Sequence, residues 1–360
     1  MRIGVLGGSF DPLHLGHLTL AENARVSAGL SKVLFMPASI QPFKQDMRFS
    51  PDDERVAMIE FAARENPYFE LSWVELERGG VSYTIDSLRE LRAGLPAGDE
   101  LAFILGTDMF LMVEKWHRSG ELLREFGLIV GTRPGYRDDE VSALAEKLRS
   151  AYGTRIDMVG SSAMLLSASE IRKRLTQGES IRYLVPEDVR CYLLVRAKEN
   201  PSRWEHTKRV MDFAAELAAR YGENVYRAKI AALLHDYCKD SSGGVENNLT
   251  HGALAAQAAA GEFGISDEDV LNAIRYHTTG RENMSRLEMI LFIADTLAPG
   301  RTYSEAAQLR ELARKDLRVC TLAVLIELKR YLAANGYDSS RDSEDAIKWL
   351  EQELTETTTR

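Results

Sequence analysis

The chain has 360 residues, of which 45% are hydrophobic and 28% charged, and its formal net charge is −9. This is ordinary globular composition, long enough for two or three domains of about 150 residues, and it excludes a disordered tail, a fibre and a membrane bundle. The negative charge argues against a general nucleic-acid-binding protein, which needs a basic field. The net negative charge does not exclude a phosphate-binding site, because lysine and arginine residues can still gather in one cleft.

The sequence shows no membrane or secretory signal. Its longest apolar runs, such as 101–105 and 289–294, are far shorter than the roughly 20 residues that cross a bilayer. The first residues lack the apolar core of a signal peptide. Three widely spaced cysteines, Cys191, Cys238 and Cys320, offer no disulfide framework. We therefore expect a cytoplasmic protein without a membrane partner; the sequence does not indicate its oligomeric state.

Short apolar runs alternate with amphipathic segments over residues 1–196. The expected strands cover 2–6, 32–37, 69–75, 100–106, 127–132 and 155–159, and the expected helices between them cover 14–28, 51–64, 85–93 and 138–151. Ser50 is expected to cap the helix that begins at Pro51. Strand–helix alternation at this spacing predicts an α/β fold with a doubly wound parallel sheet.

From residue 204 onward the pattern predicts helices throughout. They are expected at 204–221, 225–238, 250–263, 267–277, 285–297, 303–314, 317–335 and 342–354. The polar segment 197–203, which contains Pro201, is expected to be a short linker. The sequence thus predicts an α/β domain over 1–196 and an all-α helical bundle over 204–360.

A glycine-rich segment follows the first expected strand. Gly7 and Gly8 would let the backbone approach an anion closely, and a helix begins shortly after them. His14 and His17 are three residues apart, so they share one face of that helix. Ligands of open parallel sheets bind at the carboxyl ends of the strands. The segment therefore predicts a phosphate site in which imidazoles stabilise developing charge.

Later segments of the first half add polar groups of the same kind. Lys44 supplies a cation on the loop after the second expected strand. Ser167 and Glu170 have the spacing of a capping box, and Arg172 lies in the first turn of the same helix. A well-capped helix explains this pattern by itself, and a polyanion site at the helix end is compatible with it.

Taken in order, these motifs resemble bacterial nicotinate-mononucleotide adenylyltransferases over residues 1–195. The resemblance is carried by Gly7-Gly8-Ser9-Phe10, by His14-Leu15-Gly16-His17, and by the segments 41–44, 82–88, 106–108, 116–117, 133–135 and 166–172. It implies a Rossmann-like nucleotidyltransferase that transfers AMP from ATP, with Mg²⁺, to nicotinate mononucleotide. The products would be nicotinate adenine dinucleotide, a precursor of NAD, and pyrophosphate.

The same resemblance implies two sets of site residues. The ATP phosphates would be held by Gly7, Gly8, Ser9, Phe10, Lys44, Ser169 and Arg172, with His14 and His17 as the catalytic residues. The nicotinate nucleotide would be held by Thr84, Gly106, Asp108, Trp116 and Arg133, with the indole stacked on the ring. The chain reads Gln-Pro-Phe-Lys over 41–44 where the family usually reads Pro-Pro-His-Lys, and Ser-Ala-Ser over 167–169 where it reads Ser-Ser-Thr. These departures concern affinity more than reaction type.

The helical half contains six candidate metal ligands. Imidazole and carboxylate groups are the usual ligands of catalytic divalent metals, and a bundle builds such sites from several helices. Because His235 and Asp236 are adjacent, one carboxylate could bridge two ions while the imidazole serves one of them. The full set is His206, His235, Asp236, His251, His277 and Asp295.

The order of these ligands resembles the two-metal branch of the HD phosphohydrolase superfamily. From about 200 to 335 the local sequence resembles the bacterial symmetrical diadenosine-tetraphosphate hydrolases, which implies cleavage of diadenosine tetraphosphate into two ADP. One ion, with iron favoured, would bind His206, His235, Asp236 and Asp295, and the other would bind Asp236, His251 and His277. Asp236 and Lys239 would be catalytic, and Lys239, Arg275 and Arg281 would hold the polyphosphate.

Two other interpretations fit the sequence. The first domain could adenylylate another phosphate-bearing acceptor such as phosphopantetheine, although the segments 82–86 and 116–117 favour nicotinate mononucleotide. The helical domain could hydrolyse another nucleotide or act as a nucleotide-binding regulatory module, although the presence of all six ligands favours an enzyme.

Overall fold

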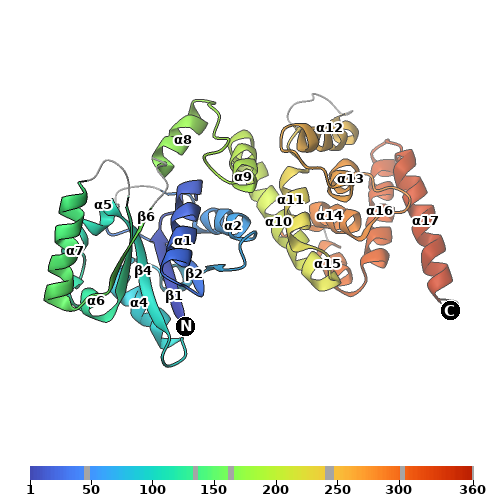
Figure 1. The fold of residues 1–360 in the computed structure, drawn as a ribbon. Helices are drawn as coiled ribbons and strands as arrows, with labels where there is room; N and C mark the ends of the chain where they lie inside the picture. The colour runs from blue at the N-terminus through green and yellow to red at the C-terminus, as the bar shows by residue number, and fades with distance from the viewer. Residues whose placement is uncertain (44–48, 133–136, 161–165, 240–246, 301–304, 359–360) are drawn as a thin grey trace. The chain divides into compact units, whose positions relative to one another are not determined.

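The computed structural model of the protein describes residues 1–43, 49–132, 137–160, 166–239, 247–300 and 305–358. The chain divides into two compact units, Met1–Arg190 and Cys191–Arg360 (Figure 1). Among the described residues, no helix is both long enough and apolar enough to cross a membrane.

A six-stranded parallel sheet forms the centre of the first unit (Figure 1). Its strands are β1 (Arg2–Gly8), β2 (Lys32–Pro37), β3 (Phe69–Leu71), β4 (Glu100–Gly106), β5 (Gly127–Thr132) and β6 (Ile156–Gly160). They lie in the order β3-β2-β1-β4-β5-β6, so the winding direction reverses between β1 and β4, where doubly wound sheets bind their ligands. The predicted fold class is confirmed.

Helices cover both faces of this sheet. They are α1 (Leu15–Ser27), α2 (Asp52–Ala63), α3 (Val74–Arg78), α4 (Thr84–Ala93), α5 (Thr107–Phe110), the short 3₁₀ helix η1 (Val113–Lys115), α6 (Ser119–Glu125), α7 (Asp138–Tyr152) and α8 (Ala168–Thr176). Ile3 and Val5 face a core shared with α4, α6 and α7. On the opposite face α1 packs closely, since a Cβ at Gly131 would lie 2.3 Å from Leu20 Cδ1.

Two local expectations in the first unit are wrong. The strand expected at 69–75 ends at Leu71, and α3 begins at Val74. The buried Glu75 belongs to α3 and accepts a hydrogen bond from Ser87 Oγ of α4 (2.6 Å), a contact distant in sequence that the local pattern does not show. The N-cap of α2 is Pro51, which provides no side-chain cap, whereas the backbone N–H of Ser50 donates to Asp11 Oδ2 (3.2 Å).

Every element described after residue 190 is a helix, as predicted. The helices are α9 (Glu187–Lys198), which spans the division, α10 (Pro201–Tyr221), α11 (Val225–Leu234), α12 (Asn247–Gly261), α13 (Glu268–Tyr276), α14 (Arg286–Leu297), α15 (Ala306–Lys315), α16 (Leu317–Ala334) and α17 (Arg341–Thr358). Residues 287–294 of α14 are all buried, so this helix occupies the core of the bundle. The segment expected as a linker, 197–203, is largely helical, with Asn200 capping α10 through a bond from the backbone N–H of Arg203 (3.1 Å).

Candidate active sites

The first candidate site begins where β1 ends. Gly7 and Gly8 are the last residues of β1, and Phe10 adopts a left-handed backbone with φ of 48°. His14 is the N-cap of α1, and its backbone N–H lies 3.3 Å from Nδ1 of His17. The two imidazoles stack with centroids 3.7 Å apart and an interplanar angle of 18°. The predicted pair therefore forms one unit at the start of α1.

A cavity of about 290 Å³ opens at the carboxyl ends of β1 and β4. Its lining brings together Gly7, Gly8, Ser9, His17, Thr84, Gly106, Asp108 and Trp116, which the sequence assigned to phosphate or nicotinate-nucleotide binding. Residues from separate segments of the chain thus share one site. Lys44 and Arg133, which were assigned to the same site, lie outside the described residues.

Other predicted phosphate residues lie outside this lining. His14 and Phe10 are buried, with 2% and 1% of their surfaces exposed. Ser169 and Arg172 belong to α8, whose first turn is capped by Ser167 Oγ accepting from the N–H of Glu170 (3.2 Å). This capping contact confirms the expected helix start.

Arg172 connects α8 to the loop that follows β1. Its Nη1 donates to the backbone oxygen of Asp11 and lies 3.7 Å from the Asp11 carboxylate, which is almost fully buried. Asp11 also accepts from the backbone of Ser50. Asp11 was not assigned a role from the sequence, although it belongs to the same Gly-Gly-Ser-Phe-Asp segment.

The other end of the cavity lies between α4 and the segment after η1. Thr84 is the first residue of α4, and its N-cap Tyr83 makes no side-chain capping hydrogen bond. The ring of His117 lies 4.2 Å from that of Tyr83, and Trp116 meets Phe103 edge to face at 5.7 Å. An uncapped helix start and an indole therefore border the same cavity, which suits a ligand that is both anionic and aromatic.

Two buried charged residues near this cavity were missed by sequence analysis. Arg55 is 1% exposed, and its Nη1 donates to the backbone oxygen of Ser9 (2.8 Å). Burial raises the pKa of Glu75, which lines the cavity, although bonds from Ser87 and Ser82 oppose the shift. Nothing in the sequence indicates that they are buried: Arg55 lies in a segment with the pattern of an amphipathic helix, and Glu75 lay in an expected strand.

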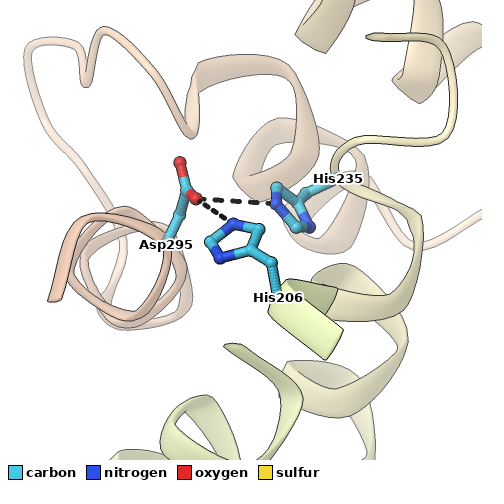
Figure 2. Close-up of side chains that lie close together, drawn as sticks. All are labelled: His206, His235 and Asp295. Atoms are coloured by element: carbon cyan, nitrogen blue, oxygen red, sulfur yellow. Dashed lines mark hydrogen bonds and ion pairs between the residues drawn. The ribbon is translucent and has the colours of Figure 1, made fainter. Parts of the chain in front are cut away.

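The second candidate site lies in the helical unit. His206 of α10, His235 at the end of α11 and Asp295 of α14 converge from three helices (Figure 2). Asp295 Oδ1 lies 2.9 Å from His206 Nε2 and 3.6 Å from His235 Nε2. These three side chains form one group with the spacing of metal ligands.

The remaining predicted ligands gather around Asp236. Its Oδ1 lies 3.2 Å from His251 Nε2 and 3.7 Å from His277 Nε2, while its Oδ2 lies 3.6 Å from His235 Nε2. His235, Asp236 and His277 form a second group with metal-ligand spacing. The structure therefore brings all six predicted ligands together, with His235 shared between the two groups.

The orientation of these imidazoles suits metal binding. Nδ1 of His235 and of His277 each lies 2.7 Å from a backbone oxygen, of Ala232 and Ile274 respectively. A proton on Nδ1 is fixed by such a bond, which leaves the Nε2 lone pair directed at the cluster. Within the described residues, His235 Nε2 and Asp236 Oδ1 are buried without a hydrogen-bond partner. A cation would satisfy both atoms.

The two carboxylates are held in their ionised form. Burial by itself raises the pKa of Asp236, but the adjacent imidazoles of His235, His251 and His277 outweigh it, so the pKa lies well below its usual range. The pKa of Asp295 is likewise lowered, because the bond with His206 and the adjacent imidazole of His235 outweigh burial. Ionised carboxylates are the form that binds metal.

The three predicted phosphate cations have different surroundings. Lys239 Nζ lies 2.7 Å from Asp236 Oδ2 and so contacts the cluster directly. Arg275 Nη1 donates to Asn272 (2.6 Å). Arg281 makes a two-bond ion pair with the buried Glu288, at 2.6 and 3.0 Å. The charge of Arg281 is therefore already paired with Glu288, whereas Lys239 contacts the cluster itself.

A further buried carboxyl group lies in this unit and was not assigned from the sequence. Glu199 is 7% exposed, and its Oε1 accepts a hydrogen bond from Thr207 Oγ1 (3.0 Å), next to His206 in the sequence. Burial raises the pKa of Glu199 to about 7. Its position in an expected linker gave no sequence signal for burial.

Comparison with known families matches each half of the chain separately. The cytidylyltransferase-like family model matches residues 5–174, and the HD domain model matches residues 203–300. A probable nicotinate-nucleotide adenylyltransferase of Trichlorobacter lovleyi is 39% identical over 217 residues, which are 56% of this chain and 100% of the relative. One of Herpetosiphon aurantiacus is 40% identical over 198 residues, 53% of this chain and 95% of the relative.

Solved structures also resemble each half. A crystal structure described as a predicted HD superfamily hydrolase involved in NAD metabolism, from Clostridium acetobutylicum, has 32% identity and a TM-score of 0.43, covering 46% of this chain and 96% of that one. Plasmodium falciparum nicotinic acid mononucleotide adenylyltransferase complexed with NaAD has 19% identity and a TM-score of 0.42, covering 50% and 86%.

Proposed function

Because this chain belongs to the nicotinate-nucleotide adenylyltransferase family through its first unit and carries an HD domain in its second, we propose that it is a bifunctional enzyme. The first unit would transfer AMP from ATP to nicotinate mononucleotide. The second would hydrolyse diadenosine tetraphosphate symmetrically. The observation that carries the first activity is the cavity shared by His17, Thr84 and Trp116.

The transfer needs little covalent work from the protein. An oxygen of the mononucleotide 5′-phosphate attacks the α-phosphorus of ATP, and the bond to the leaving pyrophosphate breaks. His17 borders the cavity and donates to the phosphate oxygens on which charge gathers, while the stacked His14 fixes its orientation. Mg²⁺ bound to the phosphates would supply further neutralisation of their charge.

The acceptor is recognised at the other end of the cavity. The nicotinate ring fits between Trp116 and the start of α4, where its carboxylate meets the uncapped helix N-terminus at Thr84. This supports the acid rather than another phosphate-bearing acceptor. Asp108 lines the same cavity and accepts from the ribose hydroxyls.

A substrate panel tests this activity. The full chain is incubated with ATP and either nicotinate mononucleotide, nicotinamide mononucleotide or phosphopantetheine, and dinucleotide and pyrophosphate are quantified. We expect the fastest transfer to nicotinate mononucleotide. Transfer only to phosphopantetheine would establish the alternative acceptor.

The HD site is proposed to hold two metal ions. His206, His235, Asp236 and Asp295 would hold one and Asp236, His251 and His277 the other, with iron favoured. The ions would supply Lewis-acid stabilisation of phosphoryl charge. Lys239 orients Asp236 through its 2.7 Å contact and offers its ammonium group to a polyphosphate. The buried, unpartnered Nε2 of His235 and Oδ1 of Asp236 carry this proposal.

Metal analysis combined with a product assay tests the second activity. The purified chain should contain metal and release ADP alone from diadenosine tetraphosphate. Asp236→Ala should lose both the metal and the hydrolysis while it retains AMP transfer. A metal-loaded protein that binds diadenosine tetraphosphate without cleaving it would instead indicate a regulatory module.

A further inference from the structure

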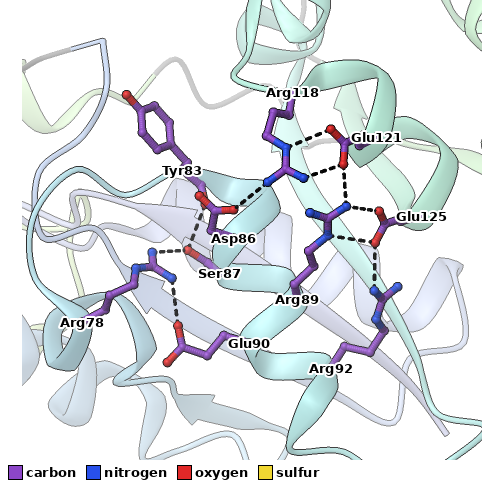
Figure 3. Close-up of polar contacts among 10 residues, drawn as sticks. All are labelled: Arg78, Tyr83, Asp86, Ser87, Arg89, Glu90, Arg92, Arg118, Glu121 and Glu125. Carbon is purple, nitrogen blue, oxygen red and sulfur yellow. Dashed lines mark hydrogen bonds and ion pairs between the residues drawn. The ribbon is translucent and has the colours of Figure 1, made fainter.

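A network of charged side chains joins α4 to α6 beside the cavity (Figure 3). Arg118 precedes α6 and donates to both oxygens of Glu121, at 2.9 and 2.6 Å. Arg89 of α4 donates to the same Glu121 at 2.8 Å and to Glu125 at 3.1 Å. Both arginines therefore share one carboxylate of α6.

The network continues along α4 in both directions. Arg92 donates to Glu125 at 2.8 Å, one helical turn after Arg89. At the other end, Arg118 Nη1 lies 3.5 Å from Oδ1 of Asp86, in the first turn of α4. The contacts thus reach from the start of α4 to the end of α6.

Arg118 lies directly after residues that line the cavity. Trp116 and His117 precede it, and Tyr83 and Thr84, which also line the cavity, precede Asp86. The contact of Arg118 with Asp86 therefore joins the two segments that carry these lining residues, as does the 4.2 Å ring contact of His117 with Tyr83.

The backbone of Arg118 needs such contacts. Its φ and ψ are 52° and 39°, a left-handed conformation that residues other than glycine adopt at a conformational cost. A single exposed ion pair contributes little, but a two-bond pair within a network contributes more. Bonds from Arg118 and Arg89 lower the pKa of Glu121 to about 2.

We propose that Arg118 is a positioning residue that holds the Trp116–His117 wall against the start of α4, and so sets affinity for the acceptor nucleotide. Arg118 acts through its neighbours and does not contact the substrates. This inference rests on the proposed function of the first unit. ATP binding depends on the other end of the cavity, around Ser9 and His17, so it should be independent of Arg118.

Arg118→Asn tests this role, because asparagine tolerates the left-handed backbone and lacks the guanidinium that makes the ion pairs. In the full chain we expect KM for nicotinate mononucleotide to rise about fivefold, which corresponds to ~1 kcal/mol, with KM for ATP unchanged. Glu121→Gln should shift the same KM in the same direction. The double variant should shift it by less than the product of the two single effects, because both act through one network.

Lys32→Met is the matched control. Lys32 forms an ion pair with Glu70 (2.8 Å) at the start of β2, the opposite end of the strand from the cavity, and both KM values should stay unchanged. If wild-type protein transfers no AMP to nicotinate mononucleotide, the proposed function fails. If wild type is active and Arg118→Asn changes neither KM, or raises both equally, the positioning role alone is wrong.

Discussion

The Nε2 atoms of His251 and His277 lie 3.0 Å apart, with Asp236 Oδ1 at 3.2 and 3.7 Å from them. Nδ1 of His277 faces the backbone oxygen of Ile274, so its Nε2 lone pair is directed at the nitrogen of His251. The short separation is satisfied either by a proton on His251 Nε2 or by a metal cation between the rings. The pair is thus arranged so that a bound metal cation could be shared by the two imidazoles and Asp236.

Metal removal should therefore destabilise the helical unit. We expect a chelator to lower the Tm of its unfolding, since binding at a hundredfold excess over Kd stabilises by about 2.7 kcal/mol. Calorimetry with parallel metal analysis measures the effect. Asp236→Ala serves as the control, and its Tm should not respond to the chelator. An unchanged Tm in wild-type protein that has lost its metal would contradict the prediction.

His17→Ala should separate the two activities. Loss of a donor to the transferring phosphoryl group is expected to reduce kcat for AMP transfer by about 10²–10³. Hydrolysis of diadenosine tetraphosphate by the same preparation should be unaffected, and it serves as the internal control for folding. Near-normal AMP transfer would remove His17 from the proposed mechanism.

Arg55→Met should weaken both the first unit and its ATP site. The change leaves the backbone oxygen of Ser9 without its 2.8 Å donor, which costs about 1–3 kcal/mol. Urea unfolding measures the loss, and KM for ATP should rise because Ser9 lines the cavity. Arg330→Ala, at a position 71% exposed, is the stability control. Equal stability of the two variants would refute the role of Arg55.

Glu199 should make stability depend on pH. Its pKa is about 7 in the folded state, against about 4.5 for an exposed glutamate, because burial disfavours the charged form. The protonated group contributes stability fully below pH 4.5, and this contribution is lost as pH rises through 7. Over that interval the loss approaches about 3 kcal/mol, at 1.36 kcal/mol per pKa unit.

Glu199→Gln tests this assignment. The amide keeps the shape and cannot ionise, so the variant should be more stable than wild type at pH 8 and similar to it at pH 5. Urea unfolding at the two pH values measures the difference. A wild-type protein whose stability relative to the variant is the same at both pH values would contradict the raised pKa.

Much of the fold could be predicted because local periodicity reports burial. β2, β4 and β5 begin and end where their apolar runs do. The helices of the second unit follow their amphipathic patterns, with ends shifted by a few residues. The strand expected at 69–75 was too long, because Glu75 lies in α3 and bonds to Ser87, twelve residues away, and a local pattern does not show such a contact.

The candidate sites divide in the same way. Residue types and their order identified the six ligands and the stacked histidines, since imidazole and carboxylate chemistry is carried by the side chain itself. The sequence did not identify the buried charged residues Arg55, Glu75 and Glu199 or the ion-pair network of Arg118. Charged residues usually lie on the surface, and only the packing of the chain shows which are buried and which share a partner.

The sequence by itself determined the two-part architecture and the chemistry available to each part, because periodicity and functional groups are local properties. Only the tertiary structure decided which groups meet. It brought His17, Thr84 and Trp116 into one cavity and placed His235 and Asp236 between ligands from four helices. Distance, burial and hydrogen-bond partners arise from packing between distant segments, and these quantities set the pKa values and orientations on which both proposed reactions depend.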